Sequence, residues 1–86
     1  MRAWCRLMKN NKIIRSDIVE LSASKLSEFV EEACQLYDLS RPIVLKKHND
    51  EWANFAHTSF VQEHFIDSFG YDRLELEIVK EKRKES

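Results

Sequence analysis

The feature that most constrains this chain is a pair of adjacent asparagines between two strand-like segments near the N-terminus. Residues 2–9 and 12–19 are rich in apolar and β-branched side chains, and Asn10 and Asn11 separate them. A two-residue hairpin turn requires a positive φ at both central positions, which asparagine tolerates better than most residues. The sequence therefore predicts a β-hairpin over residues 2–19 that reverses at Asn10-Asn11.

A tight turn at this point would also set the register of the hairpin. The pairs predicted on the buried face are Leu7–Ile14, Cys5–Ser16 and Ala3–Ile18. The pairs predicted on the outer face are Met8–Ile13, Arg6–Arg15 and Trp4–Asp17. Two arginines directly opposite each other are unfavourable, so an acidic neighbour is needed beside Arg6 and Arg15.

The clearest helical pattern covers residues 24–39. Its apolar side chains recur at intervals of three or four residues, and acidic side chains occupy the far side. The apolar stripe comprises Leu26, Phe29, Val30, Ala33, Cys34 and Tyr37. We expect Ser22 or Ser24 to cap the start of this helix. We expect Arg41-Pro42 to end it, because the residue before proline avoids the α region.

Two shorter helices are predicted after Pro42. Residues 43–45 read as a short extended segment before a helix over residues 50–57, which Asn49 would cap. The inward face of that helix would carry Trp52, Phe55 and Ala56. A further helix over residues 60–68 is indicated by the capping-box spacing of Ser59 and Gln62, with Gly70 as its left-handed cap.

The last element is a strand over residues 71–80, in which Leu74, Leu76 and Ile78 alternate with charged residues. If this strand lies beside the first one, Glu75 and Glu77 share the outer face with the two arginines. We therefore predict one α+β domain over residues 1–80, with the first strand in the middle of a three-stranded antiparallel or mixed sheet. A fourth strand is added if residues 43–45 join it, and two to three helices cover one face. The direction of the last strand stays open, and residues 81–86 are expected to be a disordered charged tail.

Composition excludes several function classes. The 86 residues carry a formal charge of −1 and contain one glycine and one proline, too few for a glycine-rich phosphate loop. No apolar run is long enough for a membrane span or an export signal, so we expect a cytoplasmic protein without a membrane partner. Cys5 and Cys34 are expected to be free, buried thiols.

Three histidines raise the question of a metal site or a catalytic role. His48, His57 and His64 are nine and seven positions apart, whereas a helical zinc pair has its histidines about four apart. The sequence predicts surface or boundary positions for these histidines, at helix ends. We therefore predict no metal, no cofactor and no catalytic residue, and the enzyme class stays open, with a non-enzyme favoured.

The outer face of the hairpin supports two interpretations. The favoured interpretation is a non-catalytic protein-interaction module that self-associates through the outer sheet face or a sheet edge, because apolar side chains bordered by charge are typical of interfaces. Its candidate interface residues are Trp4, Met8, Ile13, Arg6 and Arg15. The alternative is a protein that binds single-stranded RNA or DNA by combining an aromatic side chain with cations. Its candidate contacts are Trp4, Arg6, Lys9, Lys12 and Arg15.

Parts of the chain also resemble a known family. The segments that carry the resemblance are residues 4–9, 52–55, 65–66 and 71–78, which include Trp4-Cys5-Arg6-Leu7 and Tyr71-Asp72-Arg73-Leu74. They are similar to a family of small uncharacterised bacterial proteins, over most of the chain. The resemblance implies a cytoplasmic origin in bacteria and brings no assigned activity or site residue.

Overall fold

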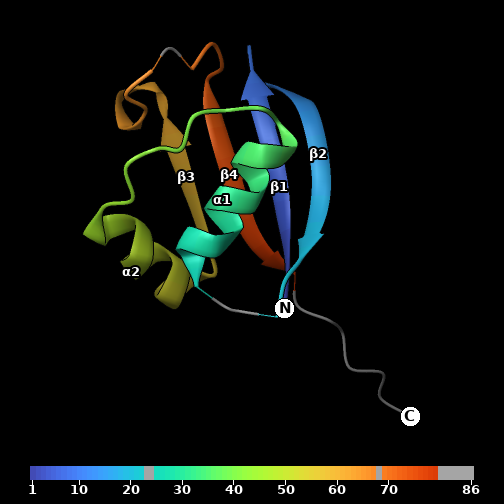
Figure 1. The fold of residues 1–86 in the computed structure, drawn as a ribbon, viewed down its shortest axis with the longest axis vertical. Helices are drawn as coiled ribbons and strands as arrows, with labels where there is room; N and C mark the ends of the chain where they lie inside the picture. The colour runs from blue at the N-terminus through green and yellow to red at the C-terminus, as the bar shows by residue number, and fades with distance from the viewer. Residues whose placement is uncertain (23–24, 68, 80–86) are drawn as a thin grey trace.

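Four strands form one antiparallel sheet in the computed structural model, which describes residues 1–22, 25–67 and 69–79. The strands are β1 (Arg2–Lys9), β2 (Lys12–Glu20), β3 (His57–Val61) and β4 (Arg73–Val79). The helices are α1 (Leu26–Leu36) and α2 (Lys46–Phe55), and a short 3₁₀ helix, η1, covers Gln62–His64. The strand order is β2-β1-β4-β3, and both α-helices lie on the same side of the sheet (Figure 1).

The predicted hairpin is present, and its turn lies at the two asparagines. Asn10 and Asn11 have φ values of 56° and 62°, the left-handed pair that a two-residue hairpin turn requires. The predicted pairing holds only next to this turn, where Met8 lies opposite Ile13. Beyond it the register shifts by one residue between Leu7 and Met8, so the other five predicted pairs are wrong.

This register shift is a β-bulge, and it changes which side chains of β2 face the core. Arg6 lies opposite Ser16 and Leu7 opposite Arg15, which leaves Ile14 as the extra residue. Ala3, Cys5 and Leu7 of β1 are buried as predicted. Ile14 and Ile18, which we expected in the core, are exposed, and the bulge places Val19 in the core in their place.

Helix α1 confirms the predicted apolar stripe, because all six of its residues are buried against the sheet. Its ends differ from the prediction. Lys25 precedes the helix and makes no side-chain cap, while Ser24 lies outside the described residues. Asp38, at φ 56°, turns the chain away after Leu36, well before Pro42. A left-handed residue therefore ends this helix, and the proline does not.

The segment after Pro42 departs most from the prediction. Residues 43–45 form no strand, and α2 begins at Lys46, earlier than expected. The helix predicted over residues 60–68 is wrong: Phe60 belongs to strand β3, which is followed by the single turn of η1. Phe55 is 73% exposed although we expected it to face inward. Gly70 does have a positive φ, but it lies in the loop that leads to β4 and does not cap a helix.

Strand β4 was predicted correctly, and it pairs antiparallel with β1. The first strand is thus internal, with β2 on one side and β4 on the other, and β3 makes the sheet four-stranded. The core lies between the sheet and the two helices, where Phe29 of α1 contacts Trp52 of α2 with ring centroids 5.7 Å apart. The tail predicted at residues 81–86 lies outside the described residues.

Candidate functional site

The outer face of the sheet is the face opposite the helices. Alternation along the strands places Trp4, Arg6 and Met8 of β1 on this face, together with Ile13, Ser16 and Ile18 of β2. No helix in the described part of the chain lies over it (Figure 1). Four of the five predicted interface residues, Trp4, Arg6, Met8 and Ile13, therefore share one face.

An ion-pair cluster occupies the middle of this outer face. The Arg6 guanidinium lies 3.1 Å from Glu75 and 2.9 Å from Glu77, and Glu75 also accepts a hydrogen bond from Arg73. The expected acidic neighbours of Arg6 are thus in place. Because Arg6 and Glu75 are largely covered, each would be left poorly solvated if its partner were removed. The centre of the outer face is therefore internally neutralised.

Trp4 and Met8 are less available than the sequence suggested. The Trp4 indole N–H donates a hydrogen bond to Ser16 Oγ, and the Arg6 guanidinium lies 4.3 Å from the Trp4 ring centroid. Met8 is only 9% exposed. Most of the freely accessible apolar surface near β1 and β2 therefore belongs to β2.

We call the free side of β2 the β2 edge, because β2 is a terminal strand of the sheet and, among the described strands, pairs with β1 alone. Three isoleucines of this nine-residue strand, Ile13, Ile14 and Ile18, are between 49% and 54% exposed. The N–H and C=O groups on the free side of an edge strand can pair with a further strand. The opposite edge strand, β3, has only five residues. Its two core-facing residues, Thr58 and Phe60, are buried.

Arg15, the fifth predicted interface residue, lies on the other face. The bulge turns Arg15 and Asp17 of β2 toward the helix side, where Tyr37, the residue that follows α1, contacts both. The Tyr37 hydroxyl donates to Asp17 Oδ2 at 2.9 Å, and the Arg15 guanidinium lies 5.0 Å from the ring centroid. Burial, followed by the hydrogen bond to Asp17, raises the pKa of Tyr37. Tyr37 thereby holds two opposite charges in place along one strand.

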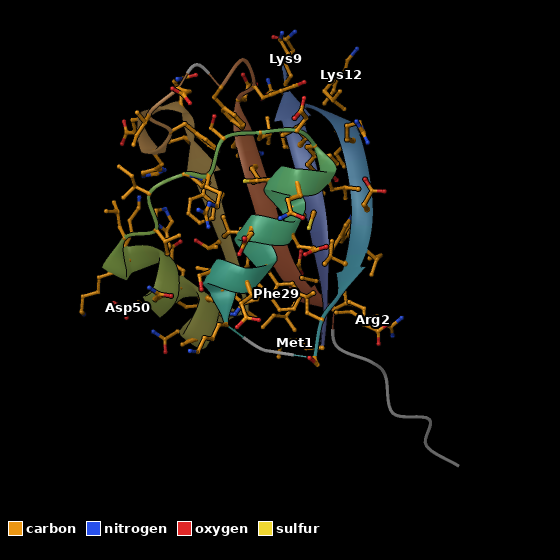
Figure 2. All side chains as sticks on the ribbon, viewed as in Figure 1. Met1, Arg2, Lys9, Lys12, Phe29 and Asp50 are labelled. Atoms are coloured by element: carbon orange, nitrogen blue, oxygen red, sulfur yellow. The ribbon has the colours of Figure 1, made fainter. Side chains whose placement is uncertain are left out.

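The residues of the nucleic-acid alternative do not form one surface. Lys9 and Lys12 project from the hairpin end, far from Met1 and Arg2 (Figure 2). Arg6 is engaged by two glutamates, and Arg15 lies on the helix side. The carboxylates beside Arg6 would also repel phosphate. The geometry therefore gives this alternative less support than the sequence did.

The prediction of surface or boundary positions is wrong for two histidines, which are buried and form a cluster that the sequence pattern did not reveal. His48 of α2 and His64 of η1 pack edge to face with ring centroids 4.6 Å apart, and His48 also stacks on Phe60. Each accepts a backbone N–H three residues earlier, from Leu45 and Val61, through its Nδ1 atom. The shared spacing is that of a capping box with histidine in the place of glutamate. This spacing is the feature of the sequence from which the two histidine caps could have been predicted.

This cluster is built for structure. Burial, followed by the charge that His64 and Lys47 would place nearby, lowers the pKa of His48. Neutral His48 can keep Nδ1 as an acceptor, whereas a protonated ring loses that capacity. His57, the third histidine, is half-buried on β3 and pairs with Glu77 across the sheet. The described residues contain no group of three or more metal-ligating side chains that could hold an ion.

The two cysteines are free and buried, as expected. Burial raises the pKa of the Cys5 thiol to about 12 and that of the Cys34 thiol to about 11. Since the thiolate is the reactive form, both thiols are poor nucleophiles at neutral pH.

A hollow of about 440 Å³ lies beside Trp4, at the end of the outer face near β3. Its lining residues are Trp4, Phe55, Ala56, Glu77, Ile78 and Val79. Glu77, the one ionisable group among these six, is already paired with Arg6. The hollow thus lacks the convergent polar groups by which a small-molecule site recognises its ligand.

Comparisons of the chain with protein-family models, with curated proteins and with solved structures find no match. The resemblance to small bacterial proteins therefore stays a prediction. Within the described ranges, neither helix has the length and apolar character needed to cross a membrane.

Proposed function

We propose that this chain is a non-catalytic protein-interaction module that self-associates through the β2 edge and the adjoining outer-face side chains. The observation that carries the proposal is the exposure of Ile13, Ile14 and Ile18 on a nine-residue terminal strand. Terminal strands of monomeric proteins are usually short or made repulsive toward a further strand. Strand β2 is long and presents three apolar side chains where a partner strand would lie.

The cysteine and histidine side chains, which are the usual nucleophiles and general bases of enzymes, support a non-catalytic role here. Cys5 and Cys34 are buried with raised pKa values, which keeps both thiols protonated. His48 and His64 use their Nδ1 atoms to cap the starts of α2 and η1. These groups are committed to the stability of the fold, while three exposed apolar side chains lie together on β2.

The test compares two isoleucine substitutions by sedimentation velocity over a range of protein concentrations. Ile18→Lys places a charge on the β2 edge, and we expect it to shift the protein toward monomer. Ile66→Lys is the matched control, because Ile66 is 81% exposed and lies outside β2. It belongs to the loop after η1, which follows β3, the strand at the opposite edge of the sheet. It should behave like the wild type. A wild-type protein that stays monomeric at millimolar concentration, or equal self-association by both variants and the wild type, would contradict the proposal.

A further inference from the structure

The sequence of β2 is symmetric about Ser16. Each apolar residue on one side corresponds to an apolar residue on the other, and each basic residue corresponds to an acidic one. Arg15 and Asp17 flank Ser16, and Lys12 and Glu20 lie four positions away on either side. At two and three positions away, both sides are apolar: Ile14 and Ile18, then Ile13 and Val19. Ser16 is the central residue of the nine-residue strand. The bulge places Ile13 and Lys12 on the opposite faces from Val19 and Glu20, so the symmetry can act between two copies only over residues 14–18.

This symmetry has a meaning for a second copy of the same strand. Two copies related by a two-fold axis perpendicular to the sheet pair antiparallel, and residues directly opposite each other lie on the same face. Such an axis must pass through a position where a residue meets its own copy. An axis at Arg15 or at Asp17 would place like charges opposite each other, which destabilises a sheet.

We infer that two copies of this chain join β2 to β2 in antiparallel order, with Ser16 on the two-fold axis. The inference rests on the proposed function and names its partner and register. Each Arg15 then faces the partner's Asp17, and each Ile14 faces the partner's Ile18. The two four-stranded sheets become one continuous sheet.

The contacts within one protomer prepare this pairing. Tyr37 positions both charges, because its hydroxyl donates to Asp17 and its ring lies beneath the Arg15 guanidinium. Side chains that are already ordered lose less conformational entropy on association. On the outer face, Ile18 lies opposite Trp4 of its own chain, so the partner's Ile14 extends an apolar row across the junction.

The bulge explains why the charges are on the helix side and the isoleucines remain outside. A strand in regular register would place Ile14 and Ile18 in the core and Arg15 opposite Arg6. The shift between Leu7 and Met8 instead leaves Ile14 without a partner on β1. Ile14 thus becomes available at the free edge, where the inferred register gives it the partner's Ile18.

The first experiment exchanges the charges and mixes the products. Arg15→Glu alone and Asp17→Lys alone each place like charges opposite each other in the homodimer, so each should dimerise at least tenfold more weakly than the wild type. An equimolar mixture of the two restores both opposite-charge pairs and should form a heterodimer, which native mass spectrometry distinguishes by mass. Failure of the mixture to associate, with both variants folded by circular dichroism, overturns the inferred register.

The second experiment leaves the charges and Tyr37 contacts intact. Across a two-fold axis at Ser16, the two Cα atoms would be about 4.5–5.5 Å apart, within the range that a disulfide spans. Ser16→Cys should therefore form a covalent dimer under mild oxidation. Glu20→Cys is the control on the same strand and face, and its two copies would lie roughly 25 Å apart.

The outcomes separate the two proposals. Dimers that resist cross-linking at Ser16 but cross-link at another β2 position would overturn the register and leave self-association through the β2 edge standing. A protein that is monomeric at every concentration, with no cross-link at any β2 position, would overturn both. Efficient cross-linking at Ser16 and none at Glu20, together with the heterodimer, supports the inferred pair.

Discussion

Acidification should destabilise this protein through the buried side chain of His48, which packs against His64. Native His48 has a lowered pKa, so it stays neutral at pH values where the unfolded chain, with a histidine pKa of about 6.5, already takes up a proton. The unfolded state then binds more protons than the native state, and stability falls as the pH decreases below about 6.5. The stabilisation is fully present above that pH and is lost progressively toward the lower native pKa.

The size of the effect is set by the number of excluded protons. One proton excluded by the native state changes the free energy of unfolding by up to about 1.4 kcal/mol per pH unit. For a chain of this length the total stability is roughly 4–13 kcal/mol, so a fall of this size is a substantial part of it. Urea denaturation at several pH values between 7.5 and 5.5 would measure the slope.

A substitution at His48 tests the cause. Glutamine at this position can still accept the Leu45 N–H, as it does in an ordinary capping box, but it does not titrate. His48→Gln should therefore flatten the pH dependence while keeping the protein folded at pH 7.5. His57→Gln, which removes a histidine outside the pair, is the matched control for the loss of one imidazole. If His48→Gln keeps the full wild-type slope, this histidine is not the group responsible.

Four further results are expected. Phe60→Ala should lower the free energy of unfolding by roughly 3–5 kcal/mol because Phe60 is fully buried, whereas exposed Phe55→Ala should change it by less than about 0.5 kcal/mol; urea denaturation measures both, and similar losses would refute the core assignment. Asn11→Val should cost about 1–2 kcal/mol because a β-branched residue resists the left-handed φ, while Asn11→Gly should be neutral or stabilising; equal effects would contradict the turn. Cys5 and Cys34 should react with a thiol reagent only after denaturation at pH 7.5, and fast reaction of the native protein would show that the burial is wrong. Single-stranded oligonucleotides should not quench the tryptophan fluorescence at low salt, and salt-sensitive quenching would favour the nucleic-acid alternative.

Local patterns predicted the hairpin turn, α1 and β4, because each depends on residues close together in the chain. Asn10 and Asn11 carry the turn by their own tolerance of positive φ. The bulge before Met8 could not be predicted in this way, since the alternation of residues 12–19 is equally compatible with a regular register. Packing under α1 selects the shifted register by placing Val19 in the core and Asp17 beside Tyr37.

The segment after α2 shows the same limit. The spacing of Ser59 and Gln62 fitted a helix start, but the backbone there extends and pairs with β4, with Phe60 opposite Leu74. A distant strand thus decides the structure of β3. The pairing of His48 with His64 is likewise non-local. The candidate interface was partly predicted: Ile13 was identified, while Ile14 and Ile18 were assigned to the core because the bulge was missed.

Amide hydrogen exchange measured residue by residue at low and high protein concentration tests most directly whether the β2 edge carries self-association. If two β2 strands pair, amides of β2 that point away from β1 should become protected as the concentration rises, while the β3 edge stays unchanged. Exchange of the β2 amides at the same rate over a hundredfold range of concentration, or protection confined to another part of the molecule, would contradict the account.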